Sequence, residues 1–280
     1  MVVQYNSTKL DRPSPLTPPS PLSESLVFDP TDDILVTDPA GSRPRKVADG
    51  LAPALSQDGR YVAFCGLPGG GQQYTQIMVV NTDGTQRTQL TRIAGSPCAP
   101  AWSPDGLKIA FNAGTNKGPS LMVLDLVRSE IHFLALGSLP RWSPDGKKLV
   151  FLRPPEARNG PASIWIINSD GTGEKKIVDS RSLIPSASWG ADGVSIIFTD
   201  DDHHRSAIFR VNLDGTNLAE IARDKNLEMY FPSISPDGKR LVVLEEEFGA
   251  HFLALVDLAT HKSHTLASGE RGDLLWVDGR

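Results

Sequence analysis

A repeat of about 44 residues runs through most of this chain and limits its possible folds more than any other feature. One repeated unit is a short apolar strand that ends in Asn or Asp. Its terminal residues follow one another at steps of 43 to 45 residues: Asp38, Asn81, Asp125, Asn168, Asn212 and Asp257. Such even spacing predicts one supersecondary unit that is repeated and stacked against its neighbours.

A second repeated unit is a turn followed by another apolar strand. Its clearest copies are Trp102-Ser103-Pro104-Asp105-Gly106 and the same five residues at 142–146. It recurs from Ser188-Trp189 to Asp192-Gly193, and weaker copies without the tryptophan surround Asp58 and Asp237. Proline presets the backbone of a type I turn, serine can bond the backbone, and glycine supplies the left-handed residue that closes the hairpin. We therefore expect these aspartates, and those of the Asn-x-Asp-Gly copies, to form turns and not to bind metal.

The strands of the repeat are apolar on both faces, as in Ile77-Met78-Val79-Val80. Such strands must be covered on both faces, and four-stranded sheets stacked around an axis provide that cover. The repeat count predicts an all-β, six-bladed β-propeller of four-stranded antiparallel blades over residues 25–280. Residues 1–24 are rich in Pro and Ser and predict a flexible tail.

The two ends of the chain complement each other. Residues 275–280 read as an inner strand with its turn, and the strand that should follow is missing there. Residues 25–28 supply a matching strand at the other end. We therefore expect the C-terminal strand to join blade one and close the ring, which removes two open sheet edges.

These residues resemble a known repeat. The segment from Ile77 to Thr91, followed by Pro100 to Phe111, is similar to the repeat of TolB-like propellers, also called PD40 repeats and related to WD40. It also resembles the propeller domains of prolyl-oligopeptidase-type peptidases. The resemblance implies a propeller over about residues 25–280, and TolB itself is periplasmic. It does not imply one function, because propellers host many.

Composition and charge narrow the partners. The net charge is −5 and no basic patch stands out, which argues against nucleic acid. No run of about 18 apolar residues occurs, so we expect no membrane insertion. No signal peptide is visible, which predicts a cytoplasmic protein, although a trimmed periplasmic or secreted chain would look the same. We also expect a monomer.

The two cysteines, Cys65 and Cys98, form no disulfide framework. Each is interpreted as either a small buried apolar residue or a reactive thiol.

Motifs for catalysis are missing from the sequence. There is no Gly-x-Ser-x-Gly elbow, no His-Glu-x-x-His and no phosphate-binding loop, and we expect no cofactor. Two function classes stay open. One is a non-catalytic binding or scaffold module for a protein or peptide. The other is a small enzyme, a lyase or hydrolase, with its site at the mouth of the central channel.

The loops suggest where a partner would bind. If the strands of each blade are lettered A to D from the axis outward, the Asp-Gly turns join A to B and C to D on one face. The B–C and D–A loops share the other face and vary in length, as functional loops do. The candidate binding residues are Arg141, which we expect beside the channel mouth, and Tyr74, Arg153, His203, His204, Tyr230, His251 and Arg271.

Overall fold

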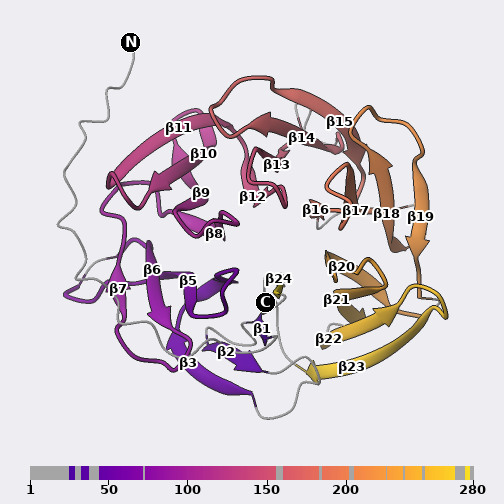
Figure 1. Ribbon diagram of the computed structural model, residues 1–280, viewed down its shortest axis with the longest axis horizontal. Coiled ribbons are helices and arrows are strands. Elements are labelled where there is room, and N and C mark those ends of the chain that lie inside the picture. Colours follow the sequence, from indigo (N-terminus) through magenta and orange to yellow (C-terminus); the bar gives the residue numbers. More distant parts are fainter. Residues whose placement is uncertain are drawn as a thin grey trace.

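The computed structural model shows a ring of β-sheets around a central opening (Figure 1). It describes residues 25–28, 33–37, 44–71, 73–155, 160–182, 185–201, 205–224, 226–235, 237–247, 250–268 and 275–277. Every regular element in these ranges is a β-strand. None of the described residues belongs to a helix that could cross a membrane. The predicted tail, residues 1–24, lies outside the described residues.

Five sheets each consist of four consecutive antiparallel strands. They are β4 (Leu51–Leu55), β5 (Tyr61–Gly66), β6 (Gln76–Asn81) and β7 (Thr88–Gln89); β8 (Cys98–Trp102), β9 (Lys108–Thr115), β10 (Gly118–Asp125) and β11 (Glu130–Leu136); β12 (Ser138–Trp142), β13 (Lys148–Arg153), β14 (Ala162–Asn168) and β15 (Lys175–Ser180); β16 (Ala187–Trp189), β17 (Ser195–Asp201), β18 (Ser206–Asn212) and β19 (Ala219–Ala222); and β20 (Glu228–Ile234), β21 (Arg240–Glu247), β22 (Ala250–Asp257) and β23 (Lys262–Ser268). The labelled first strands β8, β12, β16 and β20 lie nearest the axis of the ring (Figure 1). An all-β propeller of four-stranded antiparallel blades is therefore confirmed.

A further four-stranded sheet combines the two ends of the described chain. Its strand order is β24-β1-β2-β3, with β24 (Leu275–Val277), β1 (Ser25–Phe28), β2 (Asp33–Thr37) and β3 (Arg45–Asp49). The backbone register between β1 and β24 pairs Leu26 with Trp276. The predicted pairing of residues 25–28 with the C-terminal strand is thus found in the structure.

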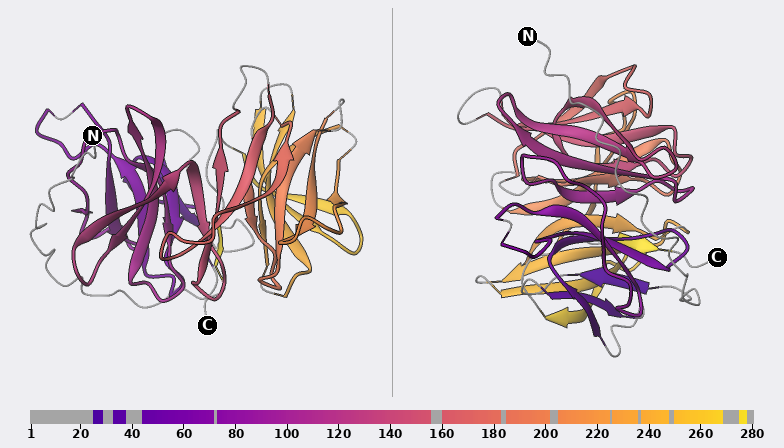
Figure 2. Two further views of the ribbon diagram at one scale, coloured as in Figure 1. Left: turned by 90° about the horizontal axis from the view of Figure 1, so that it is seen from above. Right: turned by 90° about the vertical axis from the view of Figure 1, so that its left-hand side faces the viewer.

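The hydrophobic core lies between neighbouring sheets. Phenylalanines at matching places of β5, β9, β13 and β17 are fully buried: Phe64, Phe111, Phe151 and Phe198. One core cluster joins Ile77 and Val79 of β6 to Ile109 of the next sheet. Because each sheet packs between two others, its strands are apolar on both faces, as the sequence indicated. Figure 2 shows the strands running between the two faces of the ring.

The Asp-Gly turns are built as expected. The Ser143 hydroxyl donates to Asp145 Oδ1 at 2.6 Å, and the same carboxylate oxygen accepts the N–H of Lys147 at 3.0 Å. These hydrogen bonds from Ser143 and Lys147 lower the pKa of Asp145. Gly146 adopts the left-handed conformation, φ +68°, that the turn needs. We call the face that carries these turns the turn face, and the opposite face the loop face.

The expectation that the cysteines form no disulfide is wrong. Cys65 at the end of β5 is bonded to Cys98 at the start of β8, with Cα atoms 5.0 Å apart. The two residues belong to neighbouring sheets and are 33 positions apart in sequence. Stacking of the sheets brings them together, and a pattern of two cysteines in a long chain does not reveal this.

Candidate binding site at the central opening

Tryptophan indoles link the inner strands around the opening. Trp102 Nε1 donates to the Ala54 carbonyl at 3.1 Å, and Trp142 Nε1 donates to the Ala101 carbonyl at 3.1 Å. Trp189 Nε1 repeats the bond to the carbonyl of Arg141 at 3.0 Å. Each indole ends an inner strand just before its turn, so the links connect β4, β8, β12 and β16 close to the turn face.

A cavity of about 480 Å³ opens inside these inner strands. Pro104 and Pro144 of the Asp-Gly turns contribute to it, which places its mouth on the turn face. Among the described residues that line it, Arg141 is the only side chain with a formal charge. The others are apolar, hydroxyl or amide groups: Pro53, Ala54, Leu55, Gln57, Pro100, Ala101, Trp102, Pro104, Trp142, Ser143, Pro144, Ser188, Trp189, Gly190, Ala191, Ser233 and Ile234.

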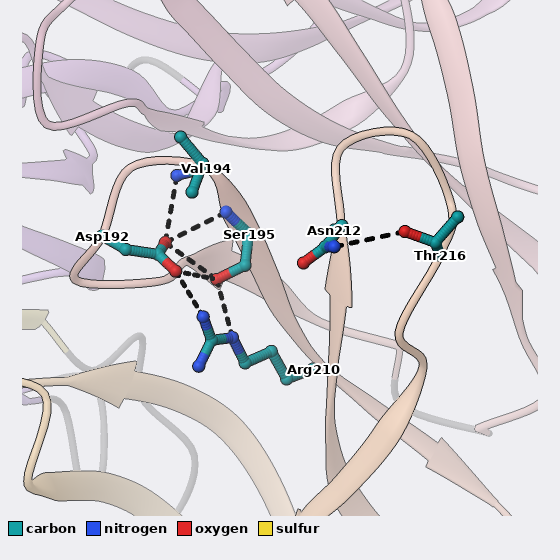
Figure 3. A network of polar contacts seen from close by, with 6 residues as sticks. All are labelled: Asp192, Val194, Ser195, Arg210, Asn212 and Thr216. Carbon is teal, nitrogen blue, oxygen red and sulfur yellow. Dashed lines mark hydrogen bonds and ion pairs between the residues drawn. The ribbon is translucent and has the colours of Figure 1, made fainter.

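The turn after β16 departs from the repeat. Gly190 and Ala191 replace serine and proline, so the usual turn hydroxyl is missing. The hydroxyl of Ser195 takes its place and contacts the Asp192 carboxylate at 2.9 Å (Figure 3). Arg210 Nε donates to Ser195 Oγ at 3.0 Å, and its Nη2 pairs with Asp192. Although partial burial opposes it, bonds from Val194, Ser195 and Arg210 lower the pKa of Asp192.

A second cavity of about 370 Å³ adjoins the central one at this point. The two share Gly190, Ala191 and Ile234. Three other repeats have a proline where Ala191 is, and three have a tryptophan where Ile234 is: Pro104, Pro144 and Pro236, and Trp102, Trp142 and Trp189. The smaller side chains leave space between the β16–β19 and β20–β23 sheets, so the central opening extends sideways at this junction. The polar side chains that line this extension, beside aliphatic ones, are Asp192, Ser195, Arg210 and Asp237.

The predicted site residues do not form one group. Arg141 lines the central cavity on the turn face. Tyr74 is 62% exposed, in the loop between β5 and β6. The Arg153 guanidinium stacks on Trp165, 4.1 Å from the ring centre, and pairs with Glu174. Tyr230 on β20 is buried, which raises the pKa of its hydroxyl.

The other predicted site residues are less well placed. His203, His204 and Arg271 lie outside the described residues. For His251 only the backbone is described, on β22 opposite Glu246.

Sequence reasoning missed Glu245 on β21. Its side chain is buried, and its Oε1 has no hydrogen-bond partner. Burial, assisted by the negative charge of Asp224, raises the pKa of Glu245 to about 7. In the sequence, only the position of Glu245 in β21, a strand with both faces covered, indicates that its side chain is buried. A charged residue in a frayed strand end would give the same pattern.

The described residues offer a surface for binding and few groups for chemistry. No group of three or more His, Cys, Asp or Glu side chains among them is placed to hold a metal ion. The central cavity has proline, tryptophan and one guanidinium in its lining. Trp and Arg are the residues that most often dominate binding energy at protein interfaces.

The sequence of this chain is similar to those of known propeller proteins. The family model described as PD40, TolB beta propeller domain, matches residues 69–274. A TolB homolog of Chlorobium luteolum is 28% identical over 143 residues, which is 50% of this chain and 32% of that protein. The Tol-Pal system protein TolB of Haemophilus influenzae is 35% identical over 65 residues, 23% of this chain and 15% of that protein. The alignments therefore span a third or less of these relatives.

Solved structures show the same fold. TolB from Acinetobacter baumannii superposes with a TM-score of 0.74 and 20% identity, covering 93% of this chain and 68% of that one. A TolB described as putative, from Agrobacterium tumefaciens, gives a TM-score of 0.68 and 19% identity, covering 89% of this chain and 91% of that one.

The relatives also correct one expectation. The cytoplasmic location expected from the sequence is wrong, because the relatives are a TolB homolog and a Tol-Pal system protein TolB, and TolB is periplasmic. The disulfide agrees with this correction, since disulfides persist in oxidising compartments such as the bacterial periplasm. With a family model matched over most of its length and the same propeller of four-stranded blades, this chain belongs to the TolB β-propeller domain family.

Proposed function

We propose that this chain is a non-catalytic binding propeller that holds a protein or peptide partner at its central opening. The observation that carries the proposal is the cavity of about 480 Å³ on the turn face. Its proline and tryptophan side chains suit an apolar segment of the partner, and Arg141 suits an acidic side chain or a terminal carboxylate. A concave, mostly apolar site with few polar groups is the usual form of a binding pocket.

The relatives supply the first candidate partner. Their name places them in a Tol-Pal system, so a Pal protein from the same organism is the partner to test first. The Cys65–Cys98 disulfide supports an encounter in an oxidising compartment.

We further propose that the β24-β1-β2-β3 sheet acts as the sixth blade and keeps the opening rigid. Its backbone pairing supports a ring that is closed by non-covalent bonds between the two ends. A rigid ring would hold the inner strands, and therefore the cavity, in a preorganised form that lowers the cost of binding.

The loop face stays a competing prediction. The B–C and D–A loops carry exposed Tyr74, and a partner that depends on them would bind away from the cavity. The two faces make opposite predictions for single substitutions, so one experiment separates them.

The experiment measures binding of the purified Pal protein by isothermal titration calorimetry. Arg141→Glu should weaken binding by at least tenfold without lowering the melting temperature, because the Arg141 carbonyl that accepts from Trp189 is retained. Lys147→Glu is the matched control, since Lys147 is exposed on the same face but outside the cavity. Loss of binding in Tyr74→Ala, with Arg141→Glu unaffected, would place the site on the loop face. No binding of Pal to the unaltered chain would refute this partner.

A further inference from the structure

The wall of the central cavity offers few hydrogen-bond acceptors to a polypeptide. The Nε1 atoms of Trp102, Trp142 and Trp189 already donate to carbonyl groups of neighbouring inner strands, so their rings contribute apolar surface. Proline, alanine, leucine and isoleucine side chains supply much of the rest. Backbone N–H groups that enter such a space without a partner cost free energy. A segment with few N–H groups therefore loses least when it enters the cavity.

The tail, residues 1–24, contains a segment of this kind. It lies outside the described residues, but its sequence has five prolines within nine positions: Pro13, Pro15, Pro18, Pro19 and Pro21. Proline has no backbone N–H, and its carbonyl is an acceptor, which suits the donor-only guanidinium of Arg141 in the cavity lining. No charged residue occurs from position 13 to position 23. A proline-rich segment is also extended before it binds, so docking costs it little conformational entropy.

The tail joins the described chain at the turn face. Leu26 of β1 pairs with Trp276 of β24 in the backbone register. Leu149 and Trp142 are paired in the same way, on the two sides of an Asp-Gly turn. By this correspondence Ser25, the first residue of β1, lies where the other sheets have their Asp-Gly turns. The mouth of the central cavity is on the same face.

The tail is also long enough to reach the cavity of its own chain. The strand β24 contacts both β4 and β20, and residues of these two strands line the cavity. Because β1 is paired with β24, Ser25 starts only one strand spacing, about 4.8 Å, from β24. Pro18 is seven positions before Ser25. Seven residues span about 22 Å in the polyproline conformation, several times that spacing.

We propose that the proline-rich segment, residues 13–21, docks in the central cavity of its own chain and competes there with the partner. The competition rests on the function proposed above, whereas the docking does not. A tethered segment acts at an effective concentration on the order of 1 mM, so a weak contact is enough to fill the cavity for much of the time. Such a contact adds little to stability, and a partner that binds more tightly displaces it.

The test compares the unaltered full-length chain with a full-length variant that carries Pro15→Ser, Pro18→Ser, Pro19→Ser and Pro21→Ser. Heteronuclear NMR spectra report the tryptophan indole N–H groups. The signals of the three cavity tryptophans, Trp102, Trp142 and Trp189, should move in the variant because their surroundings lose the proline rings. Trp165 is the internal reference, since its indole donates to Ser163 outside the cavity, and its signal should stay.

Two further samples show whether the proline segment causes the shift. A synthetic peptide of residues 9–24, added to the proline-substituted variant, should return the three cavity signals towards their original positions and saturate. The same peptide should have little effect on the unaltered chain, whose own tail already fills the cavity. A matched variant with Val2→Ser and Val3→Ser changes the tail outside the segment and should leave all the indole signals in place.

The outcomes separate docking from the proposed function. Cavity signals that are the same in the unaltered and proline-substituted chains would overturn the docking. So would a difference that appears only at high protein concentration, because the tail of another copy would then cause it. The Pal protein should bind the proline-substituted chain about threefold more tightly or better, since more of its cavities are open. Equal affinity would overturn the competition. If Pal binds neither chain, the proposed partner is refuted, and the indole signals still decide the docking.

Discussion

The hydroxyl of Ser195 fills the space beside Gly190 that a serine side chain fills in other repeats. A Cβ atom added to Gly190 would lie 2.1 Å from Ser195 Oγ. In the β8–β11 sheet the turn serine, Ser103, donates to Asp105 Oδ1 at 2.6 Å. Here Ser195 makes the equivalent contact with Asp192 from the neighbouring strand. This turn therefore still has a hydroxyl beside its aspartate, but a different residue supplies it.

This exchange predicts a coupled pair of substitutions. Gly190→Ser alone should lower the free energy of unfolding by about 1–3 kcal/mol, because two side chains would compete for one space. Ser195→Ala alone should also destabilise, since Asp192 and Arg210 each lose a partner. The double variant Gly190→Ser with Ser195→Ala should recover most of the loss. Urea unfolding of the four proteins measures the coupling, and additive losses would contradict the exchange.

Much of the fold could be predicted from the sequence because the same pattern of turn and apolar strand recurs several times along the chain. The turn hydrogen bonds of Asp145 follow from the Ser-Pro-Asp-Gly pattern, and burial of Phe111 and Phe151 follows from strands that are apolar on both faces. In the sequence the Gly190 turn reads as a further copy of the same pattern. Its replacement hydroxyl comes from another strand, and only the three-dimensional structure shows which one.

The disulfide predicts a redox-dependent stability. Cys65–Cys98 joins β5 to β8 across 33 residues, and in the chain-entropy estimate a loop of that length contributes about 3–4 kcal/mol. The melting temperature of the unaltered chain should fall on reduction with dithiothreitol. The variant Cys65→Ala with Cys98→Ser should melt at the lower temperature and show no response to the reductant. Equal melting with and without reductant in the unaltered chain would exclude a stabilising role.

The buried Glu245 predicts a loss of stability as pH rises. Between pH 4.5 and about 7 the carboxyl is ionised in the unfolded chain but stays protonated in the folded one, which favours unfolding. Above about pH 7 both states are ionised and the effect stops growing. The difference corresponds to roughly 3 kcal/mol, at about 1.4 kcal/mol for each pH unit.

Glu245→Gln should remove this pH dependence, because the amide does not ionise. The stability gained by the variant relative to the unaltered chain should therefore increase from pH 4.5 to 7 and be constant above. Urea unfolding at several pH values measures it. A stability difference that does not change with pH would show that the carboxyl has an ordinary pKa.

The candidate site was harder to predict from the sequence than the fold. Arg141 was expected at a channel mouth, and it lines the central cavity, but on the turn face. The turns are so alike in sequence that they predict a face with few features that could discriminate between ligands. The sideways extension of the opening depends on two positions that depart from the repeat, Ala191 and Ile234, whose small size matters only beside the neighbouring sheet. Tyr74 is more than 100 positions from Ala191 and Ile234 in the sequence, and its part in binding stays a prediction.

The proposed closure of the ring predicts unequal effects of trimming the two ends. Deleting residues 274–280 removes β24 and leaves the edge of β1 unpaired. The β20–β23 sheet would then adjoin a three-stranded sheet that lacks its inner strand, and exposed edges favour aggregation. We expect an insoluble chain or a strong fall in melting temperature. Deleting residues 1–22, which are rich in proline, should cost little stability. Calorimetry and solubility of the two shortened chains measure the contrast. A C-terminal deletion that melts like the full chain would show that β24 contributes nothing to closure, and the cavity would then owe its shape to the five continuous sheets alone.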